Sequence, residues 1–142
     1  MSGAQEIKTS KAPRPVGSYP HARRVGGLLF LSGMGPRQPG TDAIPGGPIR
    51  NAEGPLDYDV DAQTRATLQN IGAVLHEAGL GFEDVVDVTV FLVDMERDFQ
   101  TFNQVYAEYF PGATATRTTV EVGALPTPIA VELKVIAWLG ES

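Results

Sequence analysis

The apolar positions of this chain change their period several times, and each change marks an expected element. Between Asp59 and Gly79 they recur at steps of three and four residues, which predicts a helix with one apolar face. Gly79 is placed to end that helix. The same spacing from Phe99 to Tyr109 predicts a second amphipathic helix, for which Asp98 is the expected N-terminal cap.

The other apolar runs are short and typical of strands. We expect strands near 7–9, at 21–25, 28–32, 85–93, 116–122 and 129–138. Gly26–Gly27 separates two of these runs and predicts a hairpin. The order is strands, helix, strand, helix and two strands. We therefore predict one α+β domain over residues 1–142, with a single mixed β-sheet and two helices packed on one face.

The last two strands are predicted to have one core face and one face of mixed character. On 129–138, alternation places Ile129, Val131, Leu133, Val135 and Ala137 on one face and Ala130, Glu132, Lys134, Ile136 and Trp138 on the other. On 116–122, we expect Thr118, Val120 and Val122 to face the core and Arg117, Thr119 and Glu121 to face away from it. A face so apolar and so charged predicts a subunit interface, and hence a homo-oligomer.

Composition excludes several classes of function. The 142 residues include no cysteine, so disulfides, thiolate metal sites and a cysteine nucleophile are excluded. The two histidines have no metal-ligand spacing, and we predict no metal. A net charge of −6 argues against a nucleic-acid partner. No signal peptide and no membrane-length apolar run is evident, which predicts a cytoplasmic protein without a membrane partner.

Two ionisable residues suggest chemistry. Arg117 could grip a substrate carboxylate through two parallel hydrogen bonds. Glu132, if half-buried at an interface, would have a raised pKa and could move a proton near neutral pH. Together they make a minimal site for hydrolysing an amino or imino acid. Each also fits a simpler role, in which Arg117 is a surface arginine paired with a carboxylate and Glu132 is solvated or paired with Lys134.

Further candidates lie in the first third of the chain. Tyr19 could be a core residue or the wall of a pocket, and Ser32–Gly33 could be a simple turn or a strand end whose backbone meets a ligand. A local basic cluster comprises His21, Arg23, Arg24 and Arg37. Basic residues near a strand edge are most often solvated, but facing a pocket they would favour a second negative charge on the substrate. The Gly- and Pro-rich segment 34–56 predicts a long loop.

Several of these segments together resemble the signature of the Rid family, the YjgF-type reactive-intermediate deaminases. They are Arg117-Thr118-Thr119-Val120-Glu121-Val122, Leu125-Pro126, Glu132 to Ala137, Gly17-Ser18-Tyr19 and Leu31-Ser32-Gly33. The resemblance spans residues 15–139. It implies a chorismate-mutase-like fold, a homotrimer with three pockets at the subunit interfaces, and a reaction that needs no cofactor.

The resemblance also implies roles for individual residues. The family's carboxylate-binding arginine falls on Arg117, and its water-activating glutamate falls on Glu132. Its pocket tyrosine falls on Tyr19, and its serine–glycine strand end falls on Ser32 and Gly33. Thr119 stands where the family usually has cysteine, so any role that needs a thiol is absent here.

The details favour one branch of the family. Gly17 to His21, the two arginines Arg23–Arg24 and the long loop with Arg37 resemble the enzymes that deaminate 2-aminomuconate during bacterial degradation of aromatics. The implied reaction hydrolyses this enamine to 4-oxalocrotonate and ammonia. The substrate would be a small dicarboxylate, with His21, Arg24 and Arg37 as candidates for binding its second carboxylate and Thr119 also in the pocket.

Three alternatives remain. A general 2-imino acid deaminase would act on substrates with one carboxylate and would need little from the basic cluster. A non-enzymatic module that binds small carboxylates would need Arg117 but not Glu132. An RNA-acting protein, an activity attributed to some family members, is least favoured because the chain is acidic.

Overall fold

The computed structural model describes residues 5–140, which form one six-stranded sheet, a short hairpin and two long helices. The elements, in chain order, are β1 (Gln5–Ile7), β2 (Ala22–Val25), β3 (Leu28–Leu31), β4 (Arg50–Asn51), β5 (Gly54–Pro55), α1 (Val60–Glu77), the 3₁₀ turn η1 (Phe82–Asp84), β6 (Val85–Leu92), α2 (Met95–Tyr109), β7 (Thr116–Glu121) and β8 (Val131–Trp138).

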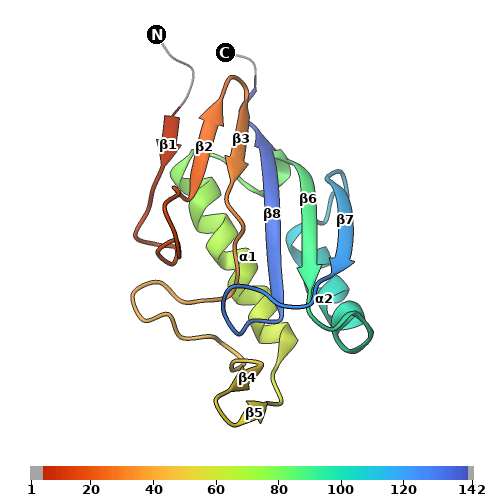
Figure 1. Cartoon of the computed structure of the whole chain (residues 1–142). Helices are drawn as coiled ribbons and strands as arrows, with labels where there is room; N and C mark the ends of the chain where they lie inside the picture. The colour runs from red at the N-terminus through yellow and green to blue at the C-terminus, as the bar shows by residue number, and fades with distance from the viewer. Residues whose placement is uncertain (1–4, 141–142) are drawn as a thin grey trace.

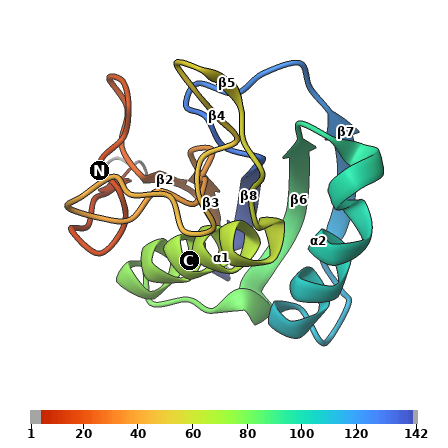
Figure 2. The same ribbon diagram turned by 90° about the horizontal axis from the view of Figure 1, so that it is seen from below.

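The large sheet has the strand order β1-β2-β3-β8-β6-β7. Only β6 and β7 run parallel, and the other neighbours are antiparallel, so the sheet is mixed. Helices α1 and α2 lie side by side on one face of this sheet (Figures 1 and 2). The predicted fold class, a single mixed sheet with two helices on one face, is confirmed. We call the face without helices the open face.

The predicted β2–β3 hairpin is confirmed at its turn. Val25 is opposite Leu28, and only Gly26 and Gly27 separate the two strands. Gly26 has a φ of 59°, in the left-handed region that most residues avoid. A Gly-Gly pair is therefore what this tight connection requires.

The two helices begin differently from each other and, in one case, from the prediction. The side chain of Asp59 caps α1 by accepting a hydrogen bond from the Ala62 amide, as expected. The cap of α2 is Asp94, which accepts from the Arg97 amide, so the predicted cap at Asp98 is wrong. Asp98 lies in the first turn of α2 with its side chain buried. Both aspartates precede the apolar stripe, and spacing alone did not separate them.

The long loop 34–56 contains the β4–β5 hairpin and is tied to α1 by two buried amides. Asn70 donates to the backbone carbonyls of Gly35 and Arg37 at 2.9 and 2.8 Å. Gln63 donates to the Gly47 carbonyl at 2.9 Å and accepts from the Ala130 amide at 2.8 Å. Gln63 thus fixes the loop and the residue just before β8 at once.

The core lies between the sheet and the helices, and β8 follows its predicted alternation. Val131, Leu133, Val135 and Ala137 are buried toward the helices. On β7, however, the predicted faces are reversed. Arg117 is opposite Val88 and Thr119 is opposite Val90, and both valines are fully buried on the helix side. Residues paired across a ladder point to the same face, so Arg117 and Thr119 face α2. Because β7 contains one valine and three threonines, the pattern of its apolar residues does not show which of its faces is buried.

Among residues 5–140, no helix combines the length and the apolar character needed to cross a membrane.

Candidate functional site

Glu132 is the second residue of β8, a strand inside the sheet, and its side chain lies on the open face. On β8 it is opposite Phe91 of β6, and its carboxylate lies against the backbone of Gly33 at the end of β3. A Cβ atom at position 33 would collide with Glu132 Oε2, so only glycine leaves room for this carboxylate. Glu132 is half-buried, and this burial raises the pKa of its carboxyl group.

The end of β3 presents free backbone beside this carboxylate. Gly33 is exposed, and within residues 5–140 neither its N–H nor its C=O has a hydrogen-bond partner. Ser32 donates from its amide to the His21 carbonyl at 2.9 Å and from its hydroxyl to the Pro20 carbonyl at 2.7 Å. These bonds hold the segment that contains Tyr19 against the strand end. Tyr19 is 42% exposed, which fits a pocket wall better than a core residue.

Lys134 lies on the same face, two residues along β8 from Glu132. Its ammonium group donates a hydrogen bond to the Leu31 carbonyl, on the residue that precedes Ser32–Gly33. It is half-buried, and burial lowers its pKa. Within the described part of the chain Lys134 forms no ion pair. The ion pair between Glu132 and Lys134, which the sequence offered as the simpler role of Glu132, is therefore absent from this structure.

Arg117 lies on the opposite side of the sheet, against the aromatic residues of α2. Its guanidinium carbon is 4.7 Å from the centre of the Tyr106 ring and 5.9 and 5.7 Å from the centres of the Phe99 and Phe102 rings. Such contacts favour a cation over a ring face. No carboxylate of residues 5–140 forms an ion pair with Arg117, so its planar fork of donors is free to bind an anion.

Two hydroxyl groups accompany Arg117. The Thr119 hydroxyl is buried on the same face of β7. The Tyr106 hydroxyl, whose ring lies under the guanidinium, is also buried, and neither hydroxyl has a partner within residues 5–140. Burial raises the pKa of Tyr106. The sequence suggested Thr119 but not Tyr106, because an aromatic residue on the apolar face of a helix is normally expected to belong to the hydrophobic core.

Arg117 and Glu132 therefore cannot act together on one small molecule within a single chain. Arg117 faces the helices, whereas Glu132 faces away from them. A hollow of about 1000 Å³ contains Tyr19 and His21 among its lining residues but neither Arg117 nor Glu132. A site that uses both groups has to take Arg117 from one chain and Glu132 from another.

The three basic residues expected to bind a second carboxylate have local roles. His21 is buried, with its Nε2 2.8 Å from the Pro13 carbonyl and its Nδ1 accepting from the Thr9 amide at 3.3 Å. Arg24 is opposite the buried Leu29, so it faces the helix side of β2.

Arg37 forms an ion pair with Asp42 at 2.7 Å and donates to the Arg14 carbonyl at 2.9 Å. Its charge is balanced within its own loop. The structure thus brings Ser32, Gly33 and Glu132 together, and it does not bring the side chains of His21, Arg24 or Arg37 to the Glu132 carboxylate.

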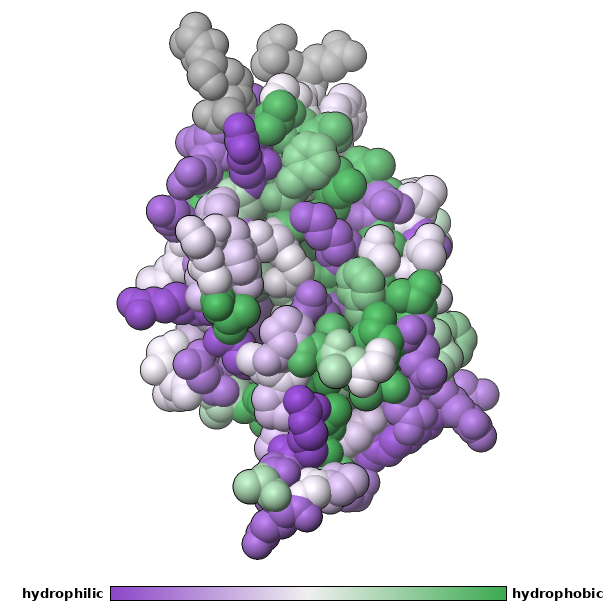
Figure 3. Space-filling view, in the orientation of Figure 1, coloured by the Kyte–Doolittle hydropathy of each residue, from purple (hydrophilic) through white to green (hydrophobic). Residues whose placement is uncertain are grey.

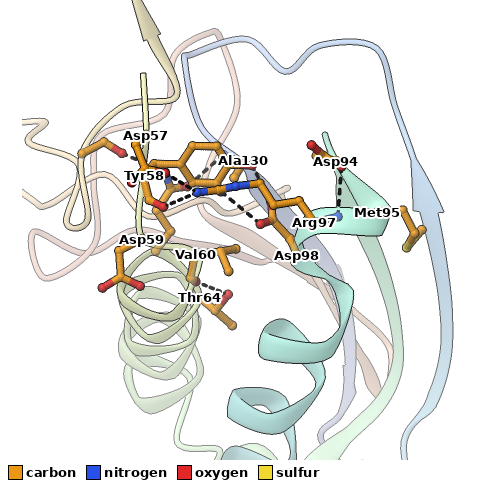
Figure 4. A network of polar contacts seen from close by, with 12 residues as sticks. Asp57, Tyr58, Asp59, Val60, Thr64, Asp94, Met95, Arg97, Asp98 and Ala130 are labelled. Atoms are coloured by element: carbon orange, nitrogen blue, oxygen red, sulfur yellow. Dashed lines mark hydrogen bonds and ion pairs between the residues drawn. The ribbon is translucent and has the colours of Figure 1, made fainter. Parts of the chain in front are cut away.

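A polar network around the buried carboxylate of Asp98 joins the start of α2 to the segment before α1 (Figure 4). Tyr58 donates to Asp98 at 2.6 Å, and Arg97 donates to Asp98 at 3.1 Å and to Asp57 at 2.8 Å. The Arg97 guanidinium carbon lies 3.6 Å from the centre of the Tyr58 ring. Desolvation and the bond to Asp98 raise the pKa of Tyr58 to about 12. Every member is paired, which identifies a structural tie rather than a reactive site.

Comparison with known proteins identifies the family. The family model described as "Endoribonuclease L-PSP" matches residues 9–139. A RutC family protein of Synechocystis is 44% identical over 134 residues, covering 94% of this chain and 95% of its own. The mouse 2-iminobutanoate/2-iminopropanoate deaminase is 36% identical over 135 residues, covering 94% and 90%. The crystal structure of the Rid family protein YyfA of Yersinia pestis is 36% identical, covers 95% of this chain and 98% of its own, and has a TM-score of 0.81.

Proposed function

The chain belongs to the Rid (YjgF/RutC, endoribonuclease L-PSP) family, and from this premise we propose that it is a hydrolytic deaminase of 2-imino acids that acts at pockets between the subunits of a homotrimer. One observation carries the proposal. A half-buried carboxyl group with a raised pKa, Glu132, lies beside the free backbone of Gly33 on the open face, while the unpaired Arg117 lies on the helix side.

The two groups divide the reaction between them. Arg117 binds the carboxylate next to the imine carbon and fixes the orientation of the substrate. Glu132, as a carboxylate, accepts a proton from a water molecule whose oxygen attacks the C=N carbon. The imine nitrogen takes up a proton, the carbinolamine that results collapses to a C=O group, and ammonia leaves. A raised pKa suits Glu132 to this proton transfer near neutral pH.

The open face supports the oligomeric part of the proposal. Apolar residues gather there on facing positions of β3 and β8: the exposed Leu28 is opposite the exposed Trp138, and the exposed Phe30 is opposite the half-buried Ile136. Figure 3 shows this face, with apolar side chains over the upper ends of β2, β3 and β8 and again lower down near β6. Trp138 alone is 52% exposed. A second copy of the chain would cover this surface and bring an Arg117 to each Glu132.

One arginine placed to bind an anion, Arg117, fits a substrate with one carboxylate beside the imine. The mouse relative is named for two such substrates, 2-iminobutanoate and 2-iminopropanoate. This similarity supports the general 2-imino acid deaminase ahead of the 2-aminomuconate enzyme.

The test is ammonia release from 2-iminobutyrate generated in the assay, with wild type, Arg117→Ala and Glu132→Ala compared side by side. We expect turnover by the wild type and a loss of at least about 100-fold in either variant. Retained binding of 2-oxobutyrate without turnover by the wild type would identify a binding module instead. Cleavage of RNA that survives both substitutions would also contradict the proposal.

Hydrolysis of 2-aminomuconate to 4-oxalocrotonate is the second candidate. It uses the same chemistry, because protonation of this enamine at carbon gives an imine, but its far carboxylate needs a second cation. His21, Arg24 and Arg37 have local partners or face elsewhere. Lys134 on the open face is the observation that favours this candidate. Supplying 2-aminomuconate in the same assay tests it directly.

A further inference from the structure

We propose that Lys134 is a substrate-binding residue that makes the site prefer imino acids with a second negatively charged group at the far end of the side chain. The proposal rests on the proposed function, because it concerns the same pocket. Alternation along the strand places Lys134 on the mixed face, where the sequence suggests only a pairing with Glu132 that the structure does not contain.

The first support is position. Lys134 and Glu132 alternate with buried residues on β8, so both side chains stand on the open face, about 7 Å apart along the strand. The ammonium group reaches the Leu31 carbonyl and therefore lies beside the same strand end, Ser32–Gly33, whose free backbone borders Glu132. A small substrate that binds at Glu132 could therefore also contact the ammonium group of Lys134.

The second support is the bonding of Lys134. An ammonium group has three donors, and the Leu31 carbonyl takes one of them. Its half-burial removes water without supplying a counter-charge from residues 5–140. Desolvated cations gain most from an anion that pairs with them. A carboxylate arriving with the substrate would supply that pairing.

The third support is elimination among the cations of the same end of the molecule. Arg37 is neutralised by Asp42, Arg24 faces the helix side, and both ring nitrogens of His21 are occupied. Arg23 is opposite Phe30 and so faces the open face, but it lies on β2, which β3 separates from β8. Lys134 is the basic group that shares both a strand and a face with Glu132. The chemical class it would recognise is a dicarboxylic 2-imino acid or the corresponding enamine.

The experiment compares two substrates on four proteins. Ammonia release is measured from 2-iminobutyrate, whose side chain is uncharged, and from 2-iminoglutarate, whose side chain ends in a carboxylate. The proteins are the wild type, Lys134→Met, Lys134→Arg and the control Lys11→Met, which makes the same chemical change at an exposed position after β1. Sedimentation confirms that each variant keeps the oligomeric state of the wild type.

We expect Lys134→Met to lower kcat/KM for 2-iminoglutarate by about 10- to 100-fold, mainly through KM, and to change 2-iminobutyrate by less than about threefold. Lys134→Arg should restore most of the preference, and Lys11→Met should leave it unchanged. Equal losses on both substrates, or no loss on either, would overturn the proposal, since they would show a structural role or none.

A second measurement separates this inference from the function itself. Calorimetric binding of 2-oxoglutarate and 2-oxobutyrate, which are product analogues, needs no turnover. If the wild type deaminated neither imine, the proposed function would fail, yet a preference for 2-oxoglutarate that disappears in Lys134→Met would still support the role of Lys134. Equal binding of the two oxo acids by the wild type would contradict it.

Discussion

The burial of Glu132 opposes the ionisation that its proposed catalytic role requires. Its carboxyl group has to be ionised to activate water, but its half-burial favours the neutral form and raises its pKa. Between the pKa of an unfolded glutamate, about 4.3, and the raised pKa, the folded protein binds more protons than the unfolded chain. The free energy of unfolding therefore falls as pH rises through this window.

Replacing the Glu132 carboxyl group by a neutral amide should remove the destabilisation that its ionisation causes at high pH. We expect Glu132→Gln to raise the thermal midpoint of unfolding at pH 8 and to change it little at pH 4, while ammonia release is lost. Thermal scans at the two pH values measure this, with Glu53→Gln as the control because Glu53 is exposed. A lower midpoint at pH 8 would mean that the carboxylate is stabilised by contacts in the assembled protein.

Gly33 matters because of the space above its Cα atom. In Gly33→Ala the new methyl group would collide with Glu132 Oε2, and the carboxylate would have to move. We expect kcat/KM for 2-iminobutyrate to fall by at least about 10-fold, since misplacement of a catalytic group by about 1 Å is costly. Stability should change little, because the carboxylate end of the side chain can swing away.

Gly123→Ala provides the matched control for this substitution. A Cβ atom there would meet no atom within 4 Å, so activity should stay at the wild-type level. Full activity in Gly33→Ala would show that the carboxylate does not need its present position.

At the scale of elements, the start of α2 depends on the Tyr58–Arg97–Asp98 network. Asp98 is 1% exposed, and a buried carboxylate is costly unless it is hydrogen-bonded. Tyr58→Phe removes one of its two donors. We expect a loss of about 1–3 kcal/mol in the free energy of unfolding at pH 7.

Urea denaturation measures this loss, with Tyr109→Phe as the control. The Tyr109 ring packs on Phe82, and no hydrogen bond involves its hydroxyl within residues 5–140. Equal losses in the two variants would assign the effect to the ring environment instead of to the bond with Asp98.

Elements were predictable from sequence where local chemistry dominates. Asp59 and Gly79 bound α1, and Gly26–Gly27 closes the hairpin, because caps and tight turns demand those residue types. The faces of β7 were not predictable, because its orientation follows from pairing with β6. Arg117 turns inward because the rings of α2 accept a guanidinium, which is a tertiary contact that no local pattern contains.

At the scale of the whole molecule, the candidate site is split across the two faces of one sheet. Sequence and resemblance selected Arg117 and Glu132, and the registers of β7 and β8 place them on opposite faces. The basic cluster does not lie on one surface, because neighbours in sequence, such as Arg23 and Arg24, alternate between faces on β2. Only the three-dimensional pairing shows which charges share a surface with Glu132.

This division makes a prediction about mixed oligomers. In a cyclic trimer each interface joins two different surfaces, so each pocket would use Arg117 from one chain and Glu132 from its neighbour. We expect trimers of Arg117→Ala alone and of Glu132→Ala alone to be inactive. Refolding or co-expressing the two variants in equal amounts should restore roughly one quarter of wild-type ammonia release, because about one interface in four pairs the two intact residues.

Mixing the two variants without exchange of subunits is the control and should restore nothing. A double variant that carries both substitutions in one chain, mixed with the wild type, should retain activity only at interfaces between two wild-type chains. If the two single variants formed mixed trimers without any recovery, both residues of a pocket would have to come from the same chain. That outcome contradicts their placement on opposite faces of the sheet, since no contact within one subunit brings Arg117 to Glu132.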